Sequence, residues 1–245
     1  MEHNSLDFTA NLADVELNTP ASSVQQKAPI TTSNQQQAKP TGDKKPASAC
    51  SLFTVEYWKE YFDVTEEEIV GKVKACLNPT TTAFEQMIDV KIDLYGPFWI
   101  STSLVFAMIV IPKLWAVLFF QDISFDVSKI GFAFTLIYGG LAVFAFIFYG
   151  MSKFMGVPAS LFKTAAIYGY GYSIFLVAAL ACVLHISFFK FLFAIGAGFH
   201  SGLFLIRNFK PILEQLDPSN RLICMVYFGV QQLFMTLMIY FNYFK

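Results

Sequence analysis

His200 and Ser201 are the adjacent residues whose types match a general base and a nucleophile. Successive residues of a helix point about 100° apart, so neighbours in the sequence cannot pair across a site. The other histidines, His3 and His185, lie far away, and the stretch from Lys129 to Leu213 contains no Asp or Glu that could orient a base. The sequence therefore predicts a protein that is not an enzyme.

Tyrosine and glycine alternate in the segment Tyr168–Tyr172, in a pattern superficially similar to a potassium selectivity filter. A filter needs a re-entrant loop, whereas this segment lies inside an apolar stretch long enough to span a bilayer. Close helix packing explains it better. Ala165 and Gly169 are four residues apart, as are Gly198 and Gly202, and each pair offers a flat patch where backbones can approach. We expect the tyrosine hydroxyls to form hydrogen bonds between helices.

The four cysteines predict neither a disulfide framework nor a metal site. Cys50 and Cys76 precede the apolar stretches, in a region that we expect to face the reducing cytosol. Cys182 and Cys224 lie within those stretches, where a thiol packs as a small apolar group. No Cys or His pair has metal-ligand spacing, so we predict no metal and no other cofactor.

The elements that carry these residues are predicted to be transmembrane helices, because about 20 apolar residues cross a hydrocarbon core of about 30 Å. The chain is therefore predicted to be an all-α membrane protein with five spans, which places its termini on opposite sides. The predicted spans are Tyr95–Ile111, Ile130–Met151, Thr164–Leu184, Ser187–Ile206 and Leu222–Phe244.

The end of the first span has two interpretations, because a second apolar run, Leu114–Phe120, follows Pro112 and Lys113. The helix either stops at the proline or continues as one longer, kinked helix. We prefer the stop, since a lysine in mid-bilayer costs about 2.5 to 3.5 kcal/mol whereas one near a helix end can reach the headgroups.

Residues 1–49 are predicted to be a disordered cytosolic tail, because they are rich in Asn, Gln, Ser, Thr and Pro and poor in aromatic residues. Residues 1–96 carry 8 lysines and 14 acidic residues, whereas residues 97–245 carry 9 basic and 4 acidic residues. Neither part has the concentrated basic patch that nucleic-acid binding requires. The lack of a signal peptide ahead of the first span places the N-terminus in the cytosol and the C-terminus in the lumen.

Residues 50–94 are predicted to be a cytosolic juxtamembrane region of short amphipathic helices. Thr65 and Glu68 form a capping box at a helix start. An apolar stripe then follows at Ile69, Val70, Val73, Cys76 and Leu77. Upstream, Tyr57, Trp58, Tyr61 and Phe62 form an aromatic helical face that either packs on the membrane surface or span ends or binds a partner protein.

The segment Asp93-Leu94-Tyr95-Gly96-Pro97 joins this region to the first span, and it resembles the Asp-Leu-Tyr-Gly-Pro signature of the Yip family, the Ypt/Rab-interacting membrane proteins. Two further segments are similar to its YIPF branch: the aromatic run Tyr57–Val64, and Tyr170-Gly171-Tyr172-Ser173 in the third span. The resemblance covers about residues 52–244 and implies a Yip-type membrane domain over 95–244.

The resemblance implies a polytopic trafficking factor of the Golgi membrane, with the ER and transport vesicles as further compartments. It implies Rab-type GTPases and other Yip/Yif-like membrane proteins as partners, and a role in vesicle transport and Golgi organisation. A transporter or channel of small solutes or ions is the alternative function. It is disfavoured because the central spans lack acidic residues and five spans do not divide into two equal repeats.

Overall fold

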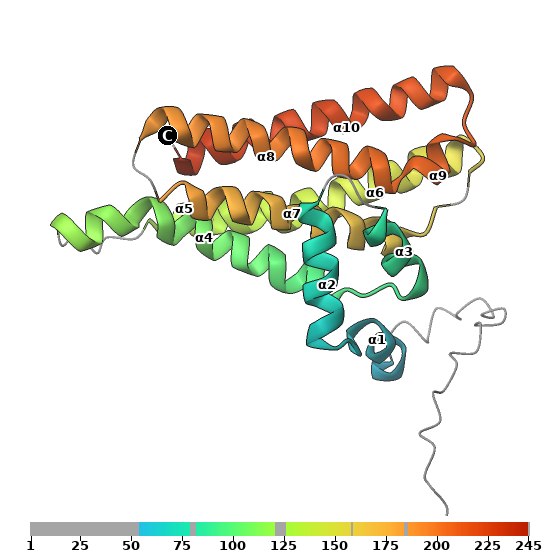
Figure 1. Cartoon of the computed structure of the whole chain (residues 1–245), viewed down its shortest axis with the longest axis horizontal. Helices are drawn as coiled ribbons and strands as arrows, with labels where there is room; N and C mark the ends of the chain where they lie inside the picture. Colours follow the sequence, from blue (N-terminus) through green and yellow to red (C-terminus); the bar gives the residue numbers. More distant parts are fainter. Residues whose placement is uncertain (1–53, 79–81, 121–125, 158, 184–185, 245) are drawn as a thin grey trace, which may run out of the picture. The chain divides into compact units, whose positions relative to one another are not determined.

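A computed structural model describes residues 54–78, 82–120, 126–157, 159–183 and 186–244 (Figure 1). The described part is helical and contains no strand. The predicted tail, residues 1–49, and Cys50 lie outside it.

Five helical segments are long and apolar enough to cross a membrane, which confirms the predicted fold class. The first lies in α4 (Tyr95–Phe120). The second starts with α5 (Val127–Phe134) and continues through a π-helical segment, Thr135–Gly139, into α6 (Gly140–Phe154). The other three are α7 (Leu161–Ala181), α8 (Ser187–Asn208) and α10 (Pro218–Ile239), with the single turn α9 (Lys210–Leu213) between α8 and α10. A second π-helical segment, Tyr240–Phe244, follows α10.

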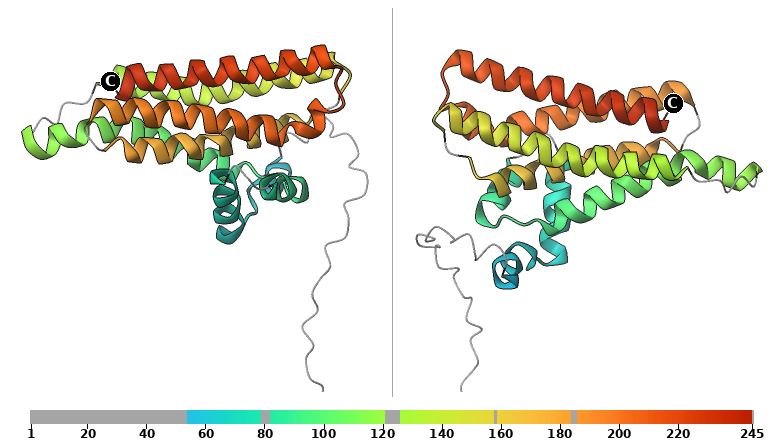
Figure 2. Two further views of the ribbon diagram at one scale, coloured as in Figure 1. Left: turned by 45° about the horizontal axis from the view of Figure 1, so that its top comes forward. Right: turned by 180° about the vertical axis from the view of Figure 1, so that it is seen from behind.

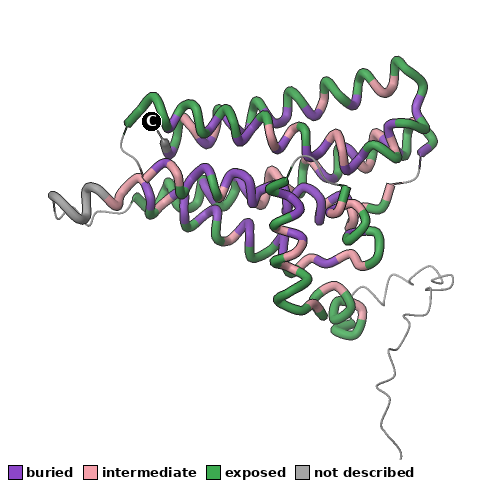
Figure 3. Tube along the Cα trace, in the orientation of Figure 1, coloured by how far each residue is buried: buried purple, intermediate pink, exposed green. Residues whose placement is uncertain are grey.

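Helix α7 lies at the centre of the bundle and contacts α4, α6 and α8, while α10 packs beside α8 (Figure 2). Residues of α7 are buried along most of its length (Figure 3). In its most apolar window 72% of residues are buried inside the protein, against 22–44% in the other spans. Neighbouring helices can approach α7 closely because several of its buried residues are small: Ala166, Gly169, Gly171 and Ala179.

The predicted helix stop at Pro112 is wrong, because α4 continues through this residue to Phe120. A proline removes only one backbone donor, and transmembrane helices tolerate this loss where neighbouring groups replace the bond. The apolar segment that could span the membrane ends at Leu114, so Lys113 still lies near its end.

Three short helices precede the membrane domain: α1 (Val55–Phe62), α2 (Glu66–Leu77) and α3 (Ala83–Val90). The predicted cap of α2 is confirmed, since the Glu68 backbone N–H donates to Thr65 Oγ1 over 3.3 Å. The predicted apolar stripe of α2 is correct in part, since Cys76 is buried and Val73 packs against the core, but the buried face is rotated away from the rest of the stripe. The buried residues are Lys72, Ala75 and Cys76, whereas Val70 and Leu77 are exposed. A polar interaction that involves Lys72 sets this rotation.

Candidate functional site

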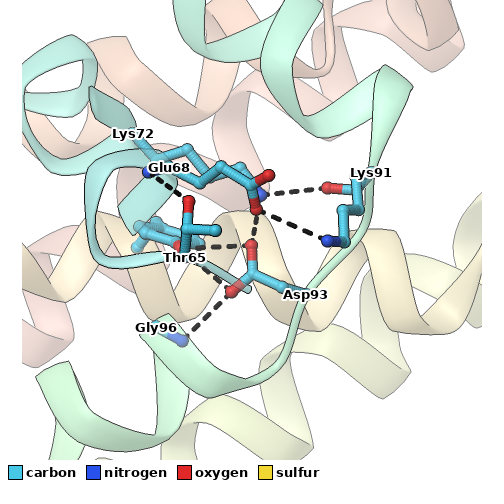
Figure 4. Close-up of polar contacts among 7 residues, drawn as sticks. Thr65, Glu68, Lys72, Lys91, Asp93 and Gly96 are labelled. Carbon is cyan, nitrogen blue, oxygen red and sulfur yellow. Dashed lines mark hydrogen bonds and ion pairs between the residues drawn. The ribbon is translucent and has the colours of Figure 1, made fainter. Parts of the chain in front are cut away.

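Asp93 is a fully buried carboxylate between α3 and α4, and it connects three elements (Figure 4). It forms an ion pair with Lys72 of α2. Its Oδ1 accepts the backbone N–H of Gly96 over 3.0 Å, which holds the first turn of α4. Lys72 Nζ also donates to the Lys91 carbonyl over 3.0 Å. A buried charge is stable only when it is paired and hydrogen-bonded, and these contacts satisfy both charges.

The same carboxylate accepts a hydrogen bond from Tyr170, in the middle of α7. The tyrosine Oη lies 2.9 Å from Asp93 Oδ1 and 3.1 Å from Oδ2. Lys72 Nζ lies 5.8 Å from the centre of the Tyr170 ring, within the range of a cation–π interaction. The junction therefore connects residues 77 positions apart through one carboxylate.

Two glycines allow this close approach. A Cβ atom at Gly96 would overlap the ring of Tyr170, and a Cβ at Gly169 would lie 2.9 Å from the backbone Cα of Pro97. Such separations are shorter than real Cβ contacts, so a larger side chain would push α4 away from α7. Gly96 of the first motif thus contacts Tyr170 of the second motif, and Pro97 contacts Gly169, the residue before it.

The remaining motif residues lie around this contact. The Tyr172 hydroxyl donates to the Ile137 carbonyl over 3.3 Å, and Tyr168 donates to Gln231 Oε1 over 2.9 Å, so the predicted hydrogen bonds between helices are present. Gly171 faces Phe204 and Ser201 of α8, and Ser173 is buried. Leu94 is half-buried, and its N–H donates to the Tyr61 carbonyl of α1 over 3.0 Å. Tyr95 is exposed and lies near Trp99.

The aromatic face of α1 lies against the start of α7. The rings of Tyr57, Trp58 and Tyr61 have centroids 5.0–6.3 Å from that of Phe162. Burial raises the pKa of Tyr61 to about 12. Trp58 and Phe62 keep 37% and 44% of their surface exposed. They also line an apolar groove of about 380 Å³. Its other walls are residues of α4, α6, α7 and the π-helical segment Thr135–Gly139.

A second groove, of about 430 Å³, runs between α2 and α3. Its lining residues include Gly71 and Met87, together with Glu67, Glu68 and Lys91. Val90 at one end is 86% exposed.

His200 and Ser201 do not form a catalytic pair. His200 Nε2 lies 3.2 Å from the Cys76 carbonyl of α2, whereas Ser201 is buried opposite Gly171. Within the described ranges no three His, Cys, Asp or Glu side chains cluster as metal ligands would. Cys76, Cys182 and Cys224 are buried free thiols.

The glycine pair of α8 faces α10. A Cβ at Gly198 would overlap the Thr236 side chain, whereas one at Gly202 would lie 3.7 Å from Gln232 Cγ, an ordinary contact. Gly198 therefore sits at a much closer helix approach than Gly202.

Two residues of this site escaped the sequence analysis. Lys72 belongs to a helix rich in charged residues, where a lysine normally faces water. The signal that could have identified it is the short spacing between this lysine and the acid at the start of the first span. Phe84 of α3 is buried, with its ring 5.2 Å from Tyr170 and 5.0 Å from Phe204, although its sequence surroundings resemble an ordinary amphipathic helix.

The fold and this junction define a class: a five-span helical membrane protein whose preceding short helices pack against its central span, with the buried Lys72–Asp93 pair at the middle of that span. The Yip1 domain model matches residues 74–239. The chain belongs to the Yip1 domain family, and the predicted Yip relationship, in its YIPF branch, is confirmed.

Two relatives support this assignment. The chain is 32% identical over 180 residues to the Protein YIPF1 homolog of Dictyostelium discoideum, an alignment that covers 72% of this chain and 52% of the relative. It is 26% identical over 184 residues to Protein YIP5 of Schizosaccharomyces pombe, covering 70% of this chain and 72% of the relative. The matched region thus spans about half the length of the Dictyostelium protein. No solved structure matches the chain.

Proposed function

We propose that this protein is a non-enzymatic trafficking factor of the Golgi and early secretory membranes. In this proposal α1–α3 face the cytosol and bind Rab-type GTPases, while the five spans anchor the complex and contact other Yip/Yif-like proteins. Family membership supports a role in membrane trafficking.

One observation carries the interaction role. The aromatic face of α1 is held at Phe162 of α7, yet Trp58 and Phe62 remain 37% and 44% exposed on a helix outside the spans. Exposed aromatic side chains on a fixed support are typical anchors of protein interfaces. Because the Leu94 N–H bonds to the Tyr61 carbonyl, α1 is also connected to the segment that carries Asp93. A partner on α1 would therefore be held at a defined place beside the membrane domain.

The test is the double substitution Trp58→Ala and Phe62→Ala in the full chain. Loss of two aromatic anchors costs about 2 kcal/mol or more each when they are interface hot spots, so recovery of Rab-type GTPases should fall at least tenfold per amount of chain. Membrane insertion should not change, because the spans are intact. Phe154→Ala is the matched control, since Phe154 is 94% exposed at the end of α6 and does not belong to the aromatic face.

The competing explanation is that these aromatics only hold α1 against α7. In that case the double substitution would expose α1 to protease and lower the amount of protein, while GTPase recovery per molecule would stay constant. An unchanged ratio would refute the binding role of the aromatic face.

A further inference from the structure

The apolar groove of about 380 Å³ beside α1, called the α1 groove below, opens on the outer surface of the bundle. Two of its lining residues on the spans, Phe98 of α4 and Phe146 of α6, are 45% and 60% exposed. Because these helices cross a membrane, that surface is covered by lipid or by another membrane protein. The occupant of the groove therefore comes from the bilayer.

The lining of the α1 groove is suited to hydrocarbon. Among the described residues, none that lines it is charged. Tyr138 presents only its ring, because its hydroxyl lies 2.6 Å from Thr102 Oγ1 and donates to the Phe98 carbonyl over 3.1 Å. Ala142 of α6 and Ala165 of α7 are small and leave space between the larger side chains. A polar group would find no partner in this space and would be costly to bury there.

The position of α1 favours a flexible chain over another helix. Trp58 and Phe62 line the groove, and the Trp58 ring lies 5.9 Å from that of Phe162 at the start of α7. A partner helix that crosses the membrane in this groove would have to continue past α1. An acyl chain ends inside the bilayer and can enter from the side.

A basic residue lies where the head of such a lipid would be. Ala142, Phe146 and Lys153 share one face of α6, because an α-helix turns about 100° per residue. Lys153 lies about 10 Å beyond Phe146 along this face. It is exposed and forms no ion pair with the part of the chain that the structure describes. At Gly150, between these two residues, an added Cβ would meet nothing within 4 Å, so the path from Lys153 to the groove is open.

We propose that the α1 groove binds a phospholipid of the leaflet on the α1 side, with one acyl chain between α4, α6 and α7 and the phosphate at Lys153. A lysine near the end of a span can extend its ammonium to the phosphate layer while its stem covers apolar surface. This proposal goes beyond GTPase binding and does not depend on it, because the spans supply most of the walls. A bound chain would also fill the space beside Trp58 and Phe62 and so support α1.

The experiment uses the purified full chain, without any GTPase, in phosphatidylcholine vesicles that contain a trace of one photoactivatable lipid. One probe is phosphatidic acid with a diazirine on its acyl chain, and the other is the diacylglycerol with the same chains. We expect adducts of the first probe to concentrate on Ala142 and Phe146. Val143 and Ile147 are the internal controls, since they are exposed on the same helix but do not line the groove. One lysine near the membrane surface should favour the phosphate-bearing probe about fivefold.

Two variants with matched controls locate the chain and the phosphate. Lys153→Gln should remove the preference for the phosphate-bearing probe, whereas Lys129→Gln, exposed at the other end of the same span, should keep it. Ala142→Trp should fill the groove and abolish the concentration of adducts there. Val143→Trp places the same bulk outside the groove and should not.

Equal labelling of residues inside and outside the groove would refute the site, because it would reflect only bulk lipid around the spans. Equal labelling by the two probes, or a preference that survives Lys153→Gln, would refute the phosphate contact. In native membranes, oxidative cross-linking of Ala142→Cys to a second copy or to another protein would refute the lipid as occupant. GTPase recovery is measured separately with the α1 variants, so failure of one proposal is distinguishable from failure of the other.

Discussion

Replacing Asp93 with Asn removes the negative charge that neutralises Lys72 while it keeps the size of the side chain. Removing one partner of a buried ion pair costs about 3 to 5 kcal/mol. We expect the lower end, about 3 kcal/mol, because the Lys91 carbonyl still accepts from Lys72 and an amide oxygen can still accept from Tyr170. This cost falls on the docked state of α2, so α2 should separate from α7 more often.

Cys76 reports this separation, since it lies one turn after Lys72 on α2 and is fully buried. Burial also raises the pKa of its thiol, so the reactive thiolate is scarce at neutral pH while α2 is docked. In a chain whose other cysteines are replaced, maleimide should label Cys76 very slowly. A change of about 3 kcal/mol in the opening equilibrium corresponds to labelling on the order of a hundredfold faster in Asp93→Asn.

Two controls make the result specific to the buried charge. Asp89→Asn breaks the ion pair between α3 and Lys163 of α7, but Asp89 is half exposed. An exposed pair contributes at most about 1 kcal/mol, so its loss should accelerate labelling by about fivefold or less. The double variant Lys72→Met with Asp93→Asn removes both charges and should label within about tenfold of the parent chain. Labelling of Asp93→Asn at the parental rate, or equally fast labelling of the single and double variants, would refute this account.

Two further predictions concern the membrane domain. Gly198→Leu should lower the free energy of unfolding in detergent by about 1 to 3 kcal/mol through overlap with Thr236, and Gly202→Leu should have a smaller effect; equal effects would contradict the distances at these two positions. In sealed microsomes, added protease should remove an N-terminal tag and spare a C-terminal one, because an odd number of spans places the termini on opposite sides; a protected N-terminal tag would overturn the proposed orientation.

The number and position of the spans could be predicted from the sequence, because hydrocarbon thickness imposes a length and a composition on each helix. The cap at Thr65 could be predicted as well, since it depends on residues three positions apart. The rotation of α2 could not. Its apolar periodicity correctly indicated that Val73 and Cys76 face inward, but it did not indicate that Lys72 lies on the buried face, paired with Asp93. That contact joins residues on opposite sides of α3 in the sequence, which the periodicity of one helix does not encode.

The same limit applies to the two motifs around Asp93 and Tyr170. Each could be recognised separately from its residues, and the glycines indicated close packing in general. That Gly96 faces Tyr170 and Gly169 faces Pro97 is a fact of tertiary structure. The prediction at Pro112 was wrong for a different reason. The preference of proline for helix ends predicted a stop there, but α4 continues through this residue.

The central position of α7 has a consequence for how the protein is made. Its most apolar window has a mean hydropathy of 1.5, below the 2.1 of the segment Val127–Phe154, and 72% of it faces protein in the finished bundle. This helix emerges from the ribosome before α8, which covers one of its sides, has been synthesised. During that interval α7 presents Tyr168, Tyr170 and Ser173 to lipid or to an insertion factor. Its integration should therefore depend more on membrane chaperones than that of any other span.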